Sequence, residues 1–439
     1  MKTLALIMLF GLAGAAAAGY KEAEGALKDM QGPKVGEISK ELDALLLLPA
    51  AALAKDARAA AYLAENQGAM ELFRQAAEEP NDGYLLAPKP EKLSVRTPAP
   101  KFAAHTRLLR LLLIEAKIKA AQKQYALAEK DLLAAAGFMA QLSAQRSALI
   151  LSSMVEQLAI LKAAPAFAES LGAPSSRPAY LKELAARLDK VYRNQDFMRA
   201  AMLEEAEISK GSMREAVNPG TMEGERAKLG FLQRLGAKKL QDQEFFSWIY
   251  RDYNAAVDAH AGVLVGAFRA NDPAPVAAYL GKRNGEIKAR REAVDKIGTF
   301  SGILDGLRGG PAAKKGMAQA IVDNMLSIGT PAYEKIIPRY HLFLARLNLL
   351  RAALAIKSYQ RAKRRLPDGL DQLVPGFLDA VPQDPFNKFA PLVYNKTGKK
   401  FLVYSFGPDG KDNGGGAALD YEAYFENPAR DAGDIIFPE

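Results

Sequence analysis

The sequence predicts a mainly α-helical protein, with a long body of helical hairpins packed as a bundle and a small C-terminal α+β domain. Two observations support this fold class. Residues 20–339 are rich in Ala, Leu, Lys and Glu with few adjacent β-branched residues, a composition that favours helices over long windows. Residues 391–406 instead contain two short runs of high β-propensity joined by a turn sequence. At 439 residues, the chain is long enough for about three domains that each bury a core.

The overall composition excludes several classes of protein. Apolar residues make up 49% and charged residues 25% of the chain, as in ordinary globular proteins, which argues against a disordered chain and a polytopic membrane protein. Lys and Arg outnumber Asp and Glu by 59 to 50, an excess too mild to indicate a nucleic-acid partner. The absence of cysteine excludes disulfides and thiolate zinc sites, and the three histidines follow no metal-binding spacing.

Residues 1–18 have the features of a secretory signal peptide. Lys2 precedes the apolar run 4–12, and small residues at 15–18 provide a signal-peptidase site, so we expect cleavage near Ala18. The apolar run is shorter than the roughly 20 residues that cross a bilayer, which disfavours an uncleaved anchor. We therefore predict a periplasmic or extracellular protein that has no transmembrane anchor after cleavage.

The mature chain is predicted to have three regions. Residues 19–100 form an N-terminal helical region that ends in a proline-rich linker at 85–100, where four prolines withhold backbone donors. Residues 101–338 form the main helical body, with helices expected at 105–120, 125–142 and 150–161. The short connections between these helices favour antiparallel hairpins. Residues 339–439 form the α+β domain.

One aromatic group in the helical body has two interpretations. Trp248 is close in sequence to Phe245, Phe246 and Tyr250. At helical spacing, such a group usually belongs to a core, and we favour that interpretation. The alternative is a groove that binds an apolar ligand.

The C-terminal domain is predicted to begin with a helix and continue with a small sheet. Apolar residues recur at spacings of four, three and four from Phe343 to Leu354, and the helix ends at the basic cluster 361–365 before Leu366-Pro367. Cations in a last helical turn complement the negative end of the helix dipole. Strands are expected at 391–395 and 399–406, joined by a turn at 396–398, and a third strand is expected at 434–437.

Three motifs follow one another in this domain. They are Leu366-Pro367 with Leu370 and Leu373, the turn Asp384-Pro385-Phe386, and the segment 404–410 with the sequence Tyr-Ser-Phe-Gly-Pro-Asp-Gly. This order resembles the C-terminal domain of the major pseudopilin of type II secretion systems. The resemblance covers residues 339–439 and implies a helix packed on a small sheet, with a calcium ion in the last loop. The chain has neither the short leader nor the long apolar N-terminal helix of a pseudopilin, so filament assembly through that helix is not expected.

The segment after the second strand is predicted to bind calcium. Residues 405–439 contain eight acidic and two basic side chains, a net charge of −6. Calcium takes about six to eight oxygen ligands, and glycines at 410 and 414–416 allow the chain to turn tightly around an ion. The resemblance implies Asp409 and Asp420 as the main ligands, and further candidates are Asp412, Asn413 and Ser405. The alternative is a polar turn without an ion, because Asp-Gly and Asn-Gly pairs are common in turns.

These observations predict a function without naming a reaction. We expect a non-enzymatic binding or assembly protein of the cell envelope, with a calcium-stabilised C-terminal loop and an envelope or secretion-system protein as its partner. One alternative is a hydrolase that cleaves envelope polymers with paired carboxylates in the helical body, although no nucleophile or zinc motif supports it. A second alternative is a soluble protein that binds a solute or a peptide.

Overall fold

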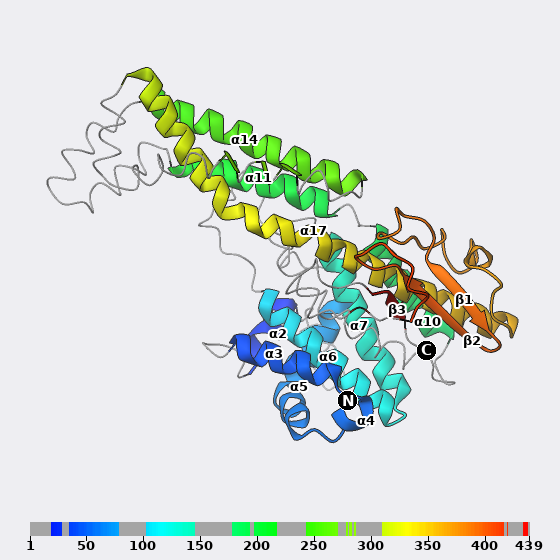
Figure 1. Cartoon of the computed structure of the whole chain (residues 1–439). Helices are drawn as coiled ribbons and strands as arrows, with labels where there is room; N and C mark the ends of the chain where they lie inside the picture. The colour runs from blue at the N-terminus through cyan, green and yellow to red at the C-terminus, as the bar shows by residue number, and fades with distance from the viewer. Residues whose placement is uncertain are drawn as a thin grey trace, which may run out of the picture. The chain divides into compact units, whose positions relative to one another are not determined.

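The structure is a computed structural model (Figure 1). The structure describes residues 19–28, 35–78, 102–144, 178–193, 197–216, 243–270, 278–279, 281–282, 285–286, 310–416, 419 and 433–437. The predicted signal peptide at 1–18, the linker at 85–100, the helix at 150–161 and Asp420 lie outside these residues. The described chain is mainly helical and ends in a three-stranded antiparallel sheet, which confirms the predicted fold class. None of the helices within these ranges is both long and apolar enough to cross a bilayer.

The chain divides into two compact units. One unit contains residues 1–86, 100–197 and 339–439, and the other contains residues 87–99 and 198–338. Segments that are distant in sequence therefore share the first unit. The predicted limits at 19–100, 101–338 and 339–439 stay predictions.

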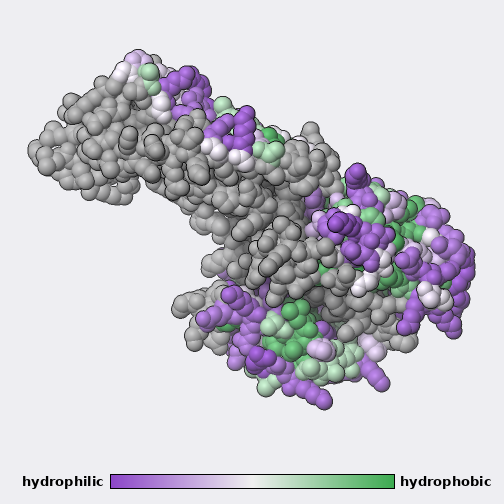
Figure 2. Space-filling model, viewed as in Figure 1, coloured by the Kyte–Doolittle hydropathy of each residue, from purple (hydrophilic) through white to green (hydrophobic). Residues whose placement is uncertain are grey.

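The first unit begins with a bundle of N-terminal helices. These are α2 (Tyr20–Ala26), α3 (Val35–Leu47), α4 (Ala50–Leu53), α5 (Ala57–Glu78), α6 (Phe102–Ala121) and α7 (Tyr125–Ala144). The last two confirm the helices predicted at 105–120 and 125–142. Tyr20, Phe73 and Phe138 meet in the core with ring centroids 5.0–5.4 Å apart. Figure 2 shows hydrophobic surface over these helices on the face that it presents.

Charged side chains are buried inside this bundle, where they pair with one another. Arg74 on α5 contacts Glu115 on α6, and its Nε lies 2.8 Å from Asp131 Oδ1 on α7. Lys119 Nζ lies 3.0 Å from both Glu115 Oε1 and Asp131 Oδ2. Burial raises the pKa of Asp131, and the two cations oppose that shift. Two positive and two negative groups therefore compensate each other and join three helices.

Helix α10 (Pro178–Arg193) packs on α7 in the same unit. Gly137 makes this close packing possible, because a Cβ atom there would lie 2.6 Å from the carbonyl oxygen of Ala77 and 2.8 Å from Arg187 Nη1. The space that Gly137 leaves is used by Arg187, whose Nη1 donates to the carbonyl of Leu133 at 2.7 Å. Arg187 also pairs with Glu78, so α5, α7 and α10 are joined at one point.

The longest helix is α17 (Pro311–Lys363). Its first residue is a proline, which suits that position because the first helical N–H has no intrahelical acceptor. The helix continues through Pro338, where the sequence suggested the start of a separate helix. It ends at Lys363, and Arg364 adopts a positive φ of 58° before Leu366-Pro367. Residues 340–356 are buried, as expected for the central helix of the first unit.

The second unit contains α11 (Phe197–Ala216), α14 (Gln243–Ala270) and the part of α17 before Arg339. A small apolar cluster joins α11 to α14, in which Ala206 packs with Val257, Ala261 and Tyr253. Lys210 on α11 also pairs with Asp258 on α14 at 2.8 Å. Two matching helical faces therefore hold this hairpin together.

A three-stranded sheet follows α17 and the short helix η3 (Leu370–Leu373). Its strands are β1 (Val393–Thr397), β2 (Lys400–Ser405) and β3 (Ile435–Phe437), in the order β1-β2-β3 and all antiparallel. Gly398 has the positive φ of 65° that the tight turn between β1 and β2 requires. The predicted hairpin and third strand are both present. Lys357 of α17 lies over the ring of Phe401, 5.0 Å from its centroid, which places β2 against the helix.

Candidate functional site

One buried carboxylate fastens the turn at 384–386 to the end of β2. Asp384 Oδ1 accepts hydrogen bonds from Ser405 Oγ at 2.6 Å and from the backbone N–H of Phe386 at 2.9 Å. Asp384 Oδ2 accepts the backbone N–H of Phe406 at 2.8 Å. Burial raises the pKa of Asp384, and the donated hydrogen bonds oppose that shift. Two of the motifs noted in the sequence therefore form a single hydrogen-bonded unit.

The loop at 407–416 depends on glycine. Gly407, Gly410, Gly414 and Gly415 have φ angles of 70°, 64°, 70° and 71°, a region that residues with side chains rarely adopt. At Gly407, a Cβ atom would also collide with the carbonyl oxygen of Gly433. The start of the loop therefore lies directly against the residue that precedes Asp434 and β3.

Asp434, which the sequence suggested only as part of a strand, holds this loop. Its side chain is fully buried, Oδ1 accepts the N–H of Asn413 at 3.3 Å, and Oδ2 accepts the N–H of Gly415 at 2.6 Å. The backbone carbonyl of Asp434 also accepts the N–H of Leu419 at 3.0 Å. A carboxylate directly before an apolar strand was the available signal, but the sequence does not show which loop it contacts.

The predicted calcium ligands take different positions. Ser405 Oγ donates to Asp384 and accepts the N–H of Gly407 at 3.2 Å, so this hydroxyl belongs to the turn. Asp412 Oδ1 accepts from Tyr404 Oη at 2.9 Å and from the N–H of Gly414 at 2.8 Å. Burial and the hydrogen bond to Asp412 raise the pKa of Tyr404 to about 12. The side-chain amide of Asn413 donates to the carbonyl of Lys411 at 3.3 Å.

Asp409 differs from these residues in one respect. Its Oδ1 accepts the N–H of Lys411 at 3.0 Å, whereas its Oδ2 is buried and has no hydrogen-bond partner among the described residues. A buried carboxylate oxygen without a donor is costly, which is the situation that a bound cation relieves. Within the described ranges, no three acidic or histidine side chains are close enough to share a metal ion, and Asp420 lies outside those ranges. The calcium site stays a prediction.

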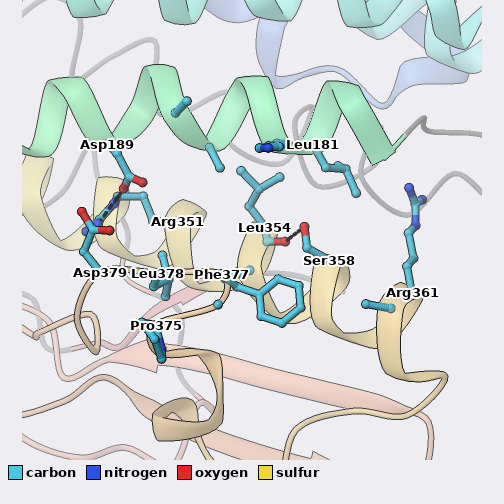
Figure 3. Close-up of a pocket in the computed structure, with 16 residues that line it drawn as sticks. Leu181, Asp189, Arg351, Leu354, Ser358, Arg361, Pro375, Phe377, Leu378 and Asp379 are labelled. Atoms are coloured by element: carbon cyan, nitrogen blue, oxygen red, sulfur yellow. Dashed lines mark hydrogen bonds and ion pairs between the residues drawn. The ribbon is translucent and has the colours of Figure 1, made fainter.

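A separate cavity of about 610 Å³ lies between α10, the C-terminal part of α17 and residues 375–379 (Figure 3). The two helices run antiparallel there, with Leu181 and Arg361 at one end and Asp189 and Arg351 at the other. Apolar side chains line the space between these ends, among them Leu181, Ala185, Leu354, Ala355, Phe377 and Leu378. The cavity therefore has an apolar middle and two polar ends.

Ion pairs lie at one end of the cavity. Arg351 is buried, and its Nε donates to Asp189 Oδ1 at 2.7 Å. Arg351 Nη1 donates to Asn348 Oδ1 at 3.2 Å, and the guanidinium lies 3.8 Å from the centroid of the Tyr192 ring. Asp379, which also lines this end, pairs with Arg193 of α10. Both carboxylates that line the cavity are thus paired with arginines.

The other end of the cavity is cationic. Arg361 lines it from α17, and burial lowers the pKa of this guanidinium while Glu129 on α7 opposes the shift. Lys182 lines the cavity from α10 and precedes Asp189 by seven residues, about two helical turns. The antiparallel register therefore places Lys182 toward the Arg361 end. In the part of the chain that the structure describes, Lys182 has no ion-pair partner.

Sequence reasoning did not identify this cavity. Asp189 and Arg351 are 162 residues apart, so no local pattern links them. Arg361 belongs to the basic cluster that was interpreted only as a complement to the helix dipole, whereas the structure places it in the lining of the cavity.

The aromatic group near Trp248 stays without an assigned role. Trp248 is half-buried on α14, and Tyr250 Oη accepts a hydrogen bond from Arg214 Nε at 3.0 Å. The side chains of Phe245 and Phe246 lie outside those that the structure describes. The assignment of this group to a core stays a prediction.

Comparison of the chain with family models, with curated proteins and with solved structures gave no match. The resemblance of residues 339–439 to a pseudopilin domain stays a prediction.

Proposed function

We propose that this chain is an exported, non-enzymatic binding protein of the bacterial cell envelope, and that the cavity between α10 and α17 is its binding site. The observation that carries this proposal is the cavity itself, whose volume is about 610 Å³ and whose middle is apolar. Cavities of roughly 300–1,000 Å³ with mostly apolar walls and a few placed polar groups are typical of ligand sites. Export is proposed from the signal-peptide features of residues 1–18.

The polar groups at the cavity support binding better than catalysis. General acid–base catalysis needs a titratable side chain that can reach the substrate, whereas Asp189 and Asp379 each form an ion pair with an arginine. The two described carboxylates whose pKa is raised are Asp131 and Asp384, and neither lines the cavity. The hydrolase alternative therefore gains no support from the residues that line the cavity.

The walls of the cavity are held in fixed positions, which favours binding. Arg351 contacts Asp189, Asn348 and Tyr192, and it thereby joins α10 to α17 along one edge. The N–H groups of Phe377 and Leu378 both donate to the carbonyl of Leu373, at 2.8 and 3.1 Å. A site whose walls are already ordered loses little conformational freedom when a ligand enters.

The proposal includes a calcium ion in the loop that follows β2. Asp409 would be the principal ligand, because its buried Oδ2 has no donor within the described chain, and Asp420 and Asp412 would add further carboxylate oxygens. The ion would stabilise the loop by linking acidic side chains that otherwise repel one another. The proposed partner of the whole protein is an envelope or secretion-system protein.

Photo-crosslinking in living cells tests the binding function. Phe377 lines the cavity, so we would replace it with p-benzoylphenylalanine in the full chain and irradiate cells of the native host. The proposal predicts a covalent adduct on the peptide that contains residue 377. Adding Ala186→Trp, a bulky substitution at an exposed residue of the cavity rim, should remove the adduct without disturbing the core.

A matched control places the same photoreactive residue at Leu127. This side chain is 49% exposed and belongs to the same unit, but it does not line the cavity. An adduct of equal mass at both positions, an adduct that Ala186→Trp leaves undiminished, or no adduct at residue 377 would each overturn the proposed binding site.

A further inference from the structure

We propose that the cavity binds a small amphiphile with one apolar chain and an anionic head group, held with the head group beside Lys182 and Arg361. This inference rests on the proposed binding function and adds the chemical class of the ligand. It depends on three features of the lining, namely the apolar middle, the paired charges at one end and the cations Lys182 and Arg361 at the other. Figure 3 shows Asp189 and Arg351 at one end and Arg361 at the other.

The apolar middle selects an apolar chain over a peptide. Between the two ends, α10 contributes Leu181 and Ala185, and α17 contributes Leu354 and Ala355. Ser358 also lines this part, but its hydroxyl donates to the carbonyl of Leu354 at 2.8 Å. The N–H groups of Phe377 and Leu378 are likewise bound to Leu373. A bound peptide would bury backbone carbonyl groups here, and these three donors are already used within the protein. Burying such polar groups without hydrogen bonds costs free energy, whereas a hydrocarbon chain needs no hydrogen bonds.

The charges orient the ligand. At one end, Asp189 is paired with Arg351 and Asp379 with Arg193, so neither carboxylate offers a strong site for a cation. At the other end, Lys182 has no ion-pair partner within the described chain, and Arg361 adds a second cation, which the Glu129 carboxylate on α7 partly balances. An anionic head group therefore meets net positive charge at that end, with a guanidinium that can form two hydrogen bonds to a carboxylate.

The length of the cavity limits the length of the ligand's hydrocarbon chain. Leu181 and Asp189 are eight residues apart on α10, which corresponds to about 12 Å along a helix. A saturated chain such as that of decanoate fits this distance. We assign the ligand as a free monomer, because the apolar part of the site lies between two helices and a loop rather than on an exposed face.

Isothermal titration calorimetry on the full mature chain tests this assignment with decanoate, decanol and decylammonium. Decanoate should bind at least fivefold more tightly than decanol, and decylammonium should bind more weakly than both. Lys182→Glu should weaken decanoate at least fivefold and change decanol less than twofold. Lys190→Glu makes the same change of charge at an exposed residue of α10 that does not line the cavity, and it should leave all three affinities within twofold. Vesicles of phosphatidylglycerol should not retain the protein.

The outcomes separate this inference from the proposed function. If decanoate and decanol bound equally, and Lys182→Glu changed neither affinity, the assignment of an anionic head group would be wrong. The proposal that the cavity binds an apolar ligand would still stand. Retention on the vesicles would overturn the free monomer as the ligand. If none of the three compounds bound, the ligand class would be wrong. The photo-crosslinking result at residue 377 would then decide separately whether the cavity binds anything.

Discussion

At the scale of single residues, the connection between the turn at 384–386 and the end of β2 depends on a buried carboxylate that receives several hydrogen bonds. Asp384 accepts from the hydroxyl of Ser405 and from the N–H groups of Phe386 and Phe406. Each of these three donors would lose its partner if the carboxylate were removed. These contacts join the Asp-Pro-aromatic turn to the Tyr-Ser-Phe end of β2.

Asp384→Ala should therefore lower the free energy of unfolding by about 2–4 kcal/mol, because it leaves buried donors unsatisfied. Chemical denaturation followed by circular dichroism measures this change. Asp379→Ala is the matched control, since that side chain is exposed and pairs with exposed Arg193, and it should change stability by less than about 0.5 kcal/mol. Equal effects of the two substitutions would show that the Asp384 contacts contribute little.

His341 makes the stability of the first unit dependent on pH. It is 4% exposed, burial lowers its pKa to about 4, and its ring lies edge-on to Phe386 with centroids 6.1 Å apart. Its pKa in the unfolded chain is about 6.5, so the unfolded state binds the proton first as the pH falls. The stabilisation is fully present above about pH 6.5 and is lost progressively as the pH falls toward 4.

Between pH 7 and pH 4, the wild-type chain should lose up to about 3 kcal/mol more stability than His341→Leu, which cannot bind a proton. The free energy of unfolding measured at several pH values for both proteins tests this difference. Carboxylates such as Asp384 titrate in both proteins and cancel in the comparison. Parallel pH profiles would contradict the assignment to His341.

At the scale of elements, the sequence predicted those helices and strands that form mainly from local spacing and turn propensity. The helices at 105–120 and 125–142 follow from apolar spacing, and the β1–β2 hairpin follows from β-prone runs around Gly398. Pro338 was a misleading signal, because α17 runs through it without a break. A proline disfavours a helix locally, but packing along a long helix can outweigh that cost.

The loop at 407–416 is the element whose predicted role needs a direct test. Holding free calcium at about a hundredfold its dissociation constant should stabilise the folded chain by roughly 2.7 kcal/mol, and chelation should reverse the effect. Asp409→Ala or Asp420→Ala should abolish this shift, whereas Glu426→Ala, outside the glycine-rich segment, should leave most of it. Magnesium should substitute poorly because it demands a tighter octahedral site.

Thermal unfolding with calcium, with magnesium and with chelator measures these effects. A melting temperature that responds to none of the three would identify the loop as a polar turn held by the hydrogen bonds of Asp409, Asp412 and Asp434. The hydrogen bonds from Gly414 to Asp412 and from Asn413 and Gly415 to Asp434 are formed in the structure, and they hold this turn without an ion.

At the scale of the whole molecule, long-range contacts create the candidate site, and the sequence alone does not reveal them. Asp189 contacts Arg351 across 162 residues, and Arg193 contacts Asp379 across 186 residues. These pairs link α10 to α17 and to residues 375–379, which are the segments that line the cavity. Composition and spacing predicted the mainly helical fold with its small sheet, but they carry no information about which distant side chains pair.

The central claim is that the cavity between α10 and α17 holds a ligand in the native protein. Native mass spectrometry of the mature chain, isolated from its own envelope without detergent, tests this claim most directly. The account predicts a small-molecule adduct that is released on unfolding, that is absent from Ala186→Trp, and that is retained by the surface control Leu127→Trp. A wild-type spectrum showing only the bare chain, or an equal adduct on Ala186→Trp, would contradict it.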